Sequence, residues 1–155
     1  MEPALMRLII CIAACSIAAV LGSLLTTPSL RPWYANLKKP VWTPPSWLFG
    51  PAWTVLFITM AISAWLVWRR VELTTVPMLL FLIQLLLNIL WSGLFFALRS
   101  PGLALLEIVL LWWAILAVAI SSWKVFPPAG WLLLPYLAWV TFAAALNFSI
   151  WRLNA

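Results

Sequence analysis

The chain has 155 residues, of which 66% are hydrophobic and only 8% are charged. A soluble domain carries about a quarter charged residues, so this composition excludes an ordinary soluble protein and indicates that lipid is the solvent. The net charge of +6 does not indicate a nucleic-acid partner, because no run of basic residues is longer than two. The cations instead lie between apolar blocks, where they can contact lipid headgroups.

Apolar blocks long enough to cross a bilayer follow one another along the chain. About twenty apolar residues span the hydrocarbon core as a helix. The strand-like alternation that a membrane barrel requires is absent from the sequence. The five blocks are Leu8–Leu25, Trp47–Trp68, Val76–Leu98, Leu103–Trp123 and Trp131–Trp151, and the helices are expected at 5–25, 46–68, 77–98, 102–123 and 131–151. The sequence therefore predicts an all-α integral membrane protein, with residues 1–155 forming a single domain that is a bundle of five transmembrane helices.

The first connection differs from the others. Residues Thr26–Ser46 include the run "KKPVWTPPS", and the aromatic side chains of Trp33, Tyr34 and Trp42 argue against disorder. A loop of this length in a compact domain is usually functional when it is ordered. The later connections are short, namely Arg69–Thr75, Arg99–Gly102 and Lys124–Gly130, and short connections make neighbouring helices antiparallel. We expect the long Pro/Trp-rich loop to fold over one end of the bundle.

The third predicted span carries two amide side chains, Gln84 and Asn88. Polar groups inside a span are costly, so they are candidates for function. At about 100° per residue, the two amides share one stripe with Trp91 and Phe95. This stripe is interpreted either as part of a pocket wall or as the source of a structural hydrogen bond between helices, and the two readings are compatible.

Gly93 and Ala97 lie on the opposite face of the same span. Small residues four positions apart let two helices approach closely. The sequence leaves two partners open for this face: another helix of the same chain, or a second protomer in a homodimer.

The second and fifth predicted spans each present one aromatic face. These faces consist of Trp53, Phe57, Met60 and Ala64 in the second span, and of Trp139, Phe142, Ala143, Leu146 and Ile150 in the fifth. A helix rises about 1.5 Å per residue, which places Trp53, Asn88 and Trp91 in the half of the membrane beneath the long loop. The sequence thus predicts an aromatic cavity under that loop. Tryptophan faces stack on planar rings, so the ligand is expected to have a large π surface.

Glu107 is the only acidic residue within a predicted span. Its position near the start of its helix favours a negative charge, because the positive end of the helix dipole lies there. Two alternatives follow for its carboxylate. It either extends to the headgroups, or it pairs inside the bundle with a lysine or arginine of the long loop.

Several kinds of chemistry are missing. The chain has no histidine, which excludes a Ser-His-Asp triad, and no glycine-rich phosphate loop. Cys11 and Cys15 lie on one face of an apolar helix, where packing is the simpler interpretation than metal ligation. No metal site and no required cofactor are predicted. A haem would lack its commonest axial ligand, so a bound tetrapyrrole would be held without protein ligation of a metal.

Three stretches carry a resemblance that covers nearly the whole chain: "WYANLKKPVWTPPSWLFGPAW", "QLLLNILWSGLFF" and "PYLAWVTFAAALNFSIWRLN". They closely resemble the tryptophan-rich sensory protein family (TspO/MBR), whose mitochondrial members are called translocator proteins or peripheral-type benzodiazepine receptors. The resemblance implies a five-helix, multi-pass membrane fold that is usually a homodimer, in a bacterial membrane, inner or outer. It also implies binding of porphyrins and haem-pathway intermediates, with sterols and benzodiazepine-type drugs binding some members.

The resemblance also assigns residues. It places Tyr34, Trp53, Asn88, Trp139, Ala143 and Leu146 at family pocket positions, and it links Trp53 and Trp139 to photo-oxidation of porphyrin. Together with the residues argued above, the candidate ligand-binding set is Tyr34, Trp42, Trp53, Phe57, Gln84, Asn88, Trp91, Trp139, Phe142, Ala143 and Leu146. At the family's sterol-motif position this chain has Phe148 before Arg152, where the family usually has a tyrosine. Sterol binding is therefore not expected to be the main activity.

Three functions are compatible with the sequence. The first is a membrane sensor or transporter that binds porphyrins, with lysines of the loop and Arg31 meeting the propionate groups. The second is an enzyme that degrades porphyrin in light, with Trp53 and Trp139 as the catalytic residues. The third is a protein that regulates a partner through the Gly93/Ala97 face.

Overall fold

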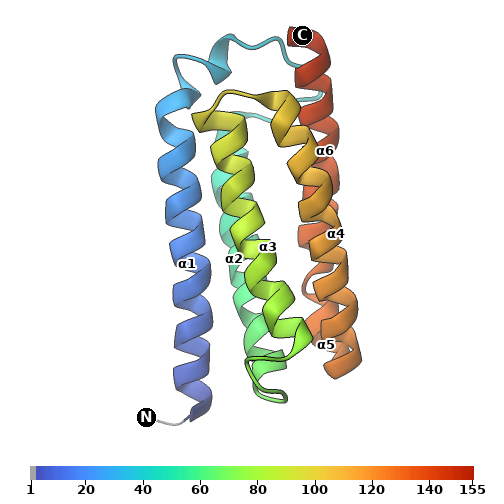
Figure 1. Ribbon diagram of the computed structural model, residues 1–155. Coiled ribbons are helices and arrows are strands. Elements are labelled where there is room, and N and C mark those ends of the chain that lie inside the picture. The colour runs from blue at the N-terminus through green and yellow to red at the C-terminus, as the bar shows by residue number, and fades with distance from the viewer. Residues whose placement is uncertain (1–2) are drawn as a thin grey trace.

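The computed structural model describes residues 3–155 and consists of helices and the segments that connect them (Figure 1). The long helices are α1 (Pro3–Leu30), α2 (Ser46–Trp68), α3 (Val76–Ser92), α4 (Pro101–Val125) and α6 (Leu134–Asn154). The shorter elements are the 3-10 helix η1 (Tyr34–Asn36), the π-helical turn η2 (Gly93–Ala97) and α5 (Pro127–Trp131). Within the described residues, five helical stretches are long and apolar enough to cross a membrane, with α3 and η2 forming one span and α5 and α6 another. The predicted five-span, all-α membrane fold is confirmed.

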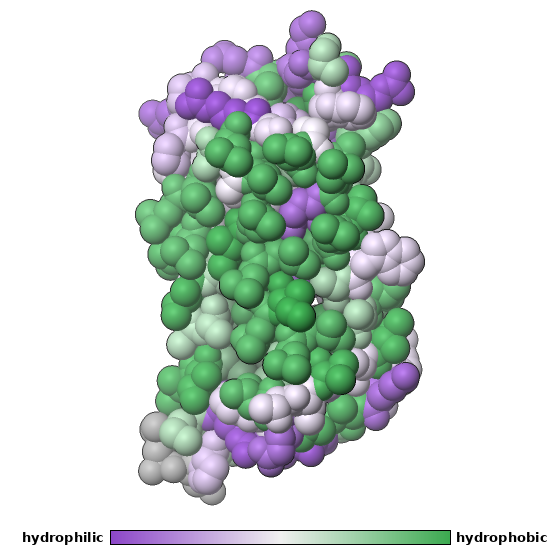
Figure 2. Space-filling view, in the orientation of Figure 1, coloured by the Kyte–Doolittle hydropathy of each residue, from purple (hydrophilic) through white to green (hydrophobic). Residues whose placement is uncertain are grey.

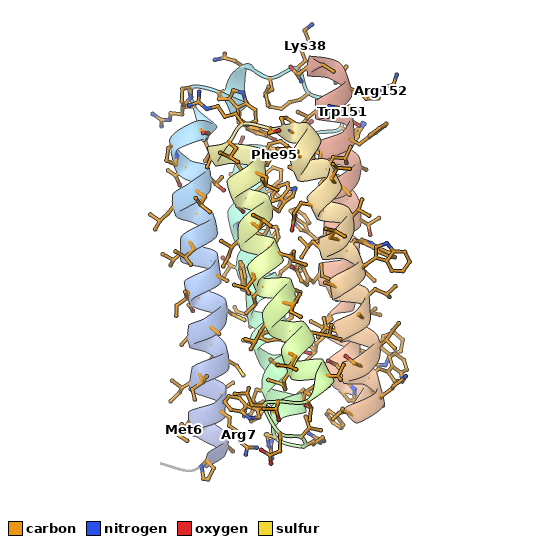
Figure 3. The ribbon with its side chains drawn as sticks, in the orientation of Figure 1. Met6, Arg7, Lys38, Phe95, Trp151 and Arg152 are labelled. Atoms are coloured by element: carbon orange, nitrogen blue, oxygen red, sulfur yellow. The ribbon has the colours of Figure 1, made fainter. Side chains whose placement is uncertain are left out.

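The surface matches a bilayer. A broad belt of hydrophobic residues crosses the face in view, and hydrophilic residues gather at both ends (Figure 2). The first described residues and the C-terminus lie at opposite ends of the bundle (Figure 1). Met6 and Arg7 are at one end, and Lys38, Trp151 and Arg152 are at the other (Figure 3). An odd number of spans requires this arrangement.

Prolines mark where the helices begin. α3, α4, α5 and α6 each carry a proline at the first or second helical position. A proline there leaves no backbone partner unsatisfied, because the first amide groups of a helix have no intrahelical acceptor. The prolines therefore place the helix starts close to where the sequence predicts them.

The first helix is longer than predicted. We expected it to end near Leu25, but α1 continues to Leu30. The hydroxyl groups of Thr26 and Thr27 donate hydrogen bonds to the carbonyls of Gly22 and Ser23, which accommodates both threonines within the helix. The predicted loop of Thr26–Ser46 is thus shortened to residues 31–45, which we call the lid.

The lid is tied to the far end of the chain. The backbone N–H of Lys38 donates to Asn154 Oδ1 (3.0 Å), and Asn154 Nδ2 donates to the carbonyl of Lys38 (2.9 Å). Since Asn154 is the last residue of α6, this pair of bonds holds the lid across the top of the bundle. The predicted position of the loop over one end is correct.

The last connection was predicted wrongly. Residues Lys124–Gly130 were expected to be a loop, but α4 runs to Val125 and α5 begins at Pro127. Pro127 and Pro128 occupy the first turn of α5, where proline is tolerated. A Cβ at Gly130 would lie 2.8 Å from Trp123 Cβ, so the glycine lets α5 fold back tightly against α4.

Candidate functional site

A cavity of about 860 Å³ lies beneath the lid between α1, α2, α3 and α6. Small-molecule sites in proteins usually measure about 300–1,000 Å³ and are mostly apolar, and this cavity has both properties. Eight of the predicted binding residues line it: Tyr34, Trp53, Phe57, Asn88, Trp91, Trp139, Ala143 and Leu146. The structure therefore brings residues of three helices and the lid to one space, as the faces of the predicted spans required.

Aromatic rings form much of the cavity wall. On α2, the rings of Trp53 and Phe57 are 5.7 Å apart between centroids. On the α3 side, Trp91 stacks on Phe95 at 5.3 Å with an angle of 27° between the planes. Phe95 is one of the labelled side chains in Figure 3 and lies just under the lid. Aromatic walls of this kind offer flat, polarisable faces to a planar ligand.

Three predicted binding residues do not line this cavity. Gln84 is fully buried in the bundle. Trp42 is exposed and contacts Phe142 edge to face, with ring centroids 5.8 Å apart. Phe142 instead faces a shallower groove between α2 and α6, which it shares with Trp139. Gln84 and Phe142 were placed by helical periodicity, which cannot tell which of two neighbouring helices closes the space in front of a residue, and Trp42 lies in the lid, where no periodicity applies.

One wall of the cavity was missed by the sequence analysis. α1 lines it along most of its length, through Leu8, Ile12, Cys15, Ser16, Ala18, Ala19, Gly22, Ser23, Thr26, Thr27 and Leu30. The signal was present, because small residues recur at Cys15, Ala18 and Gly22 along this face. Small side chains at helical spacing let α1 approach its neighbours closely, which brings this face to the cavity.

α1 contacts different helices at its two ends. At its N-terminal end α1 is tied to α2, because Arg7 Nη1 donates to the carbonyl of Trp68 (2.6 Å) and Trp65 Nε1 donates to that of Ala4 (2.9 Å). Near the lid it packs on α3, where a Cβ at Gly22 would lie 3.4 Å from Ser92 Oγ. In the lid half, several lining residues of α1 and α2 are exposed, among them Ser23, Thr27, Thr54 and Ile58, so the cavity is open on this side.

Two asparagines join the helices around the cavity. Asn88 Nδ2 donates to the hydroxyl of Tyr136 (2.8 Å), which links α3 to α6. Asn147 accepts a hydrogen bond from Trp91 Nε1 (3.1 Å) and donates one to the carbonyl of Pro101 (2.8 Å), which links α3, α4 and α6. Both asparagines also line the cavity. The two sequence readings of Asn88, as a pocket residue and as a structural hydrogen-bond donor, both hold.

The lid closes the cavity with a buried tyrosine. Lys39 Nζ lies 4.8 Å from the centroid of the Tyr34 ring and donates to the carbonyls of Ala35 (3.2 Å) and Leu37 (3.0 Å). Burial of Tyr34 raises the pKa of its hydroxyl above the ordinary tyrosine value. Lys39 is thus held against the lid itself, whereas Arg31 and Lys38 are exposed cations at the rim.

Of the two small residues on this face of the third span, one contacts another helix of the same chain and the other does not. A Cβ at Gly93 would lie 3.7 Å from Leu25 Cδ1, so Gly93 faces α1. Ala97 is exposed. The intrachain alternative therefore describes Gly93, and a homodimer through this face remains a prediction that concerns Ala97.

Glu107 follows neither predicted alternative. Its side chain is only 4% exposed, so it does not extend to the headgroups. Neither carboxyl oxygen has a hydrogen-bond partner among residues 3–155, so it does not pair with a lysine or arginine of the lid there. The prediction failed because Glu107 shares the buried face of α4 with Ile108 and Leu111 and points into the bundle.

The sterol-motif position lies outside the cavity. Phe148 and Arg152 are both exposed on α6, with the guanidinium carbon 5.9 Å from the centroid of the phenyl ring. Neither residue lines the space beneath the lid. Phe148 and Arg152 therefore do not contribute to the cavity wall.

These features define the class of the protein: a helical membrane protein of five spans with an aromatic cavity beneath an ordered lid. The sequence profile described as the TspO/MBR family matches residues 11–152, and the chain belongs to this family. It is 42% identical to the tryptophan-rich protein TspO of Chlorobaculum tepidum over 99% of both chains. It is 40% identical to the protein CrtK of Rhodobacter capsulatus over 91% of this chain and 88% of that protein. It is 41% identical to the human translocator protein over 79% of this chain and 75% of that one.

Proposed function

We propose that the protein is a membrane sensor or transporter that binds porphyrins in the cavity beneath the lid. The observation that carries this proposal is the convergence of Trp53, Trp91 and Trp139 from three different helices on one cavity. A porphyrin is a large planar π system, and tryptophan faces stack favourably on such rings. Names of relatives, "translocator protein" and "tryptophan-rich sensory protein", agree with a role in sensing or translocation.

Charge at the lid supports the same ligand class. Arg31 and Lys38 are exposed cations of the lid, and the cavity lies beneath the lid. Biological porphyrins carry carboxylate side chains. An apolar ring with acidic edges would place the ring among the tryptophans and its acids toward these cations. No cofactor or metal is needed for this binding.

The test is a titration of protoporphyrin into the protein in lipid nanodiscs, followed by porphyrin absorbance and tryptophan quenching. Replacing two of the three cavity tryptophans, Trp53→Phe with Trp139→Phe, is expected to weaken binding by about tenfold, because each loses part of its stacking surface. The matched control is Trp113→Phe with Trp131→Phe, two tryptophans that are 59% and 56% exposed. Equal affinity of the cavity and control variants would reject this cavity as the porphyrin site.

Light-dependent degradation of the bound porphyrin is the second candidate. It is favoured by the presence of both Trp53 and Trp139 in the cavity wall, where their indoles can be oxidised by an excited pigment beside them. On illumination, porphyrin absorbance should bleach faster with the wild type than with the double tryptophan variant. Equal bleaching rates would leave sensing or transport as the function.

A further inference from the structure

Four polar side chains from three helices share the interior of the bundle beside the cavity. They are Gln84 and Asn88 on α3, Glu107 on α4 and Tyr136 on α6. Their exposed fractions are 0%, 5%, 4% and 0%, respectively. Groups of this kind are rare inside a membrane protein, since moving them out of water is unfavourable unless they find partners.

The four groups are connected in sequence and space. Gln84 and Asn88 are four residues apart and therefore lie on the same face of α3, one turn from each other. Asn88 Nδ2 donates to the Tyr136 hydroxyl at 2.8 Å. Glu107 lies on α4 beside Ile108, which belongs to the same buried core cluster as Tyr136. α3, α4 and α6 thus build a polar layer together, in which the bond between Asn88 and Tyr136 links α3 to α6.

Most of the hydrogen-bonding capacity of this layer is unused. Both side-chain polar atoms of Gln84 and both carboxyl oxygens of Glu107 are buried and have no partner among residues 3–155. A buried polar atom left unpaired destabilises the folded protein, and an unpaired charge does so more strongly. Native interiors satisfy such groups in most cases, often with bound water that makes two to four hydrogen bonds.

We propose that Gln84, Asn88, Glu107 and Tyr136 form an internal site that binds water and holds Glu107 as a neutral carboxylic acid. The neutral acid can donate its proton to water and accept from water at its carbonyl oxygen. The Tyr136 hydroxyl already accepts from Asn88, so its own proton is available to the same water. Gln84 offers one donor group and one acceptor in the same layer.

The site borders the ligand cavity but is distinct from it. Asn88 lines the cavity, whereas Gln84, Glu107 and Tyr136 do not. Asn88 is therefore the one residue that the cavity wall and the polar layer share. The proposal does not depend on the identity of the cavity ligand, and it can be tested on the protein without any ligand.

Infrared spectroscopy of the full chain in lipid nanodiscs at neutral pH tests the protonation. The chain has only three acidic residues, Glu2, Glu72 and Glu107, so its carboxyl region is simple. A carbonyl stretching band of a protonated acid is expected in the wild type, retained in Glu72→Gln and lost in Glu107→Gln. A spectrum without this band, or a band that survives in Glu107→Gln, would overturn the proposal.

The same samples test the water. The difference spectrum of wild type minus Glu107→Gln should contain an O–H stretching band that moves when the water carries oxygen-18. A difference spectrum without such a band would show that the acid is held dry. Tyr136→Phe is the second variant: it keeps the acid but removes the neighbouring hydroxyl, so the carbonyl band should shift in frequency. An unshifted band would remove Tyr136 from the site.

Discussion

Asn147 shows how a single amide holds three helices at the cavity. It is 1% exposed, and its two side-chain hydrogen bonds satisfy the indole of Trp91 and the carbonyl of Pro101. The Pro101 carbonyl belongs to the first turn of α4, and Trp91 is part of the cavity wall. The amide thus fixes the orientation of a wall residue and the position of a helix start at once.

Replacing Asn147 by leucine should therefore be strongly destabilising. The variant keeps a similar volume but leaves the partly buried N–H of the Trp91 indole without its acceptor and removes the bond from α6 to the Pro101 carbonyl, which together cost about 2 kcal/mol. Thermal unfolding in detergent measures the loss. The control is Asn36→Ala, which removes an exposed hydrogen bond to the Pro32 carbonyl. Equal unfolding temperatures for the two variants would contradict this role of Asn147.

Because of Tyr34, the stability of the protein should decrease as the pH rises into the alkaline range. Burial raises the pKa of its hydroxyl in the folded protein, so the folded state keeps the proton where the unfolded chain has lost it. The resulting stabilisation is complete below the ordinary tyrosine pKa of about 10 and is lost as the pH rises through the folded-state pKa. Unfolding temperatures measured across this range should fall more steeply for the wild type than for Tyr34→Phe. Parallel curves would mean that Tyr34 contributes nothing to the pH dependence.

At the residue scale, the sequence predicted the cavity-lining residues better than the buried polar ones. Trp53, Asn88 and Trp139 were placed on the correct faces by helical periodicity and by family resemblance. Glu107 was not, because a periodicity shows which residues share a face but not which neighbouring helix that face meets. Its burial depends on α4 packing between α3 and α6.

At the element scale, the turn from α4 into α5 depends on one glycine. A Cβ at Gly130 would meet Trp123 Cβ at 2.8 Å and the Ala119 carbonyl oxygen at 2.9 Å. The carbonyl belongs to the backbone of α4 and cannot move without disturbing that helix. The close approach of α5 to α4 therefore requires the absence of a side chain at this position.

Gly130→Ala should destabilise the protein by about 2 kcal/mol, which is typical of overpacking in a tight contact. The matched control is Gly50→Ala in α2, where an added Cβ would meet nothing within 4 Å. That control should be neutral or slightly stabilising, because alanine is the better helix former. Chemical unfolding of both variants in detergent measures their free energies of unfolding. Equal losses of stability would contradict the packing role of Gly130.

Element boundaries were predicted well at the starts of α3 and α4, which proline marks, and at both ends of α2. The starts of α3 and α4 lie within two residues of the predicted positions, at Val76 and Pro101. The end of α1 and the existence of α5 were missed. In both regions residues typical of loops, Thr26 and Pro127, are accommodated by helical hydrogen bonding or by a first-turn position, which composition alone does not reveal.

At the scale of the whole molecule, the cavity is enclosed by contacts between segments far apart in the sequence. α1 is bonded to α2 near Arg7 and packs on α3 near Gly22. The lid, tied to α6 at Asn154, covers the end of the bundle above the cavity. The number of spans was predictable from hydropathy, but these contacts were not, since no local pattern specifies which distant segments meet.

The central claim is that this cavity is the binding site of a porphyrin, and filling it is the most direct test. Ala143 lines the cavity, and Ala145 is an exposed residue two positions further along the same helix. Protoporphyrin should be titrated into the wild type, Ala143→Phe and Ala145→Phe in lipid nanodiscs, with the dissociation constant as the measured quantity. The account predicts that Ala143→Phe binds at least about tenfold more weakly and that Ala145→Phe binds like the wild type. Wild-type affinity in Ala143→Phe, or an equal loss in both variants, would contradict it.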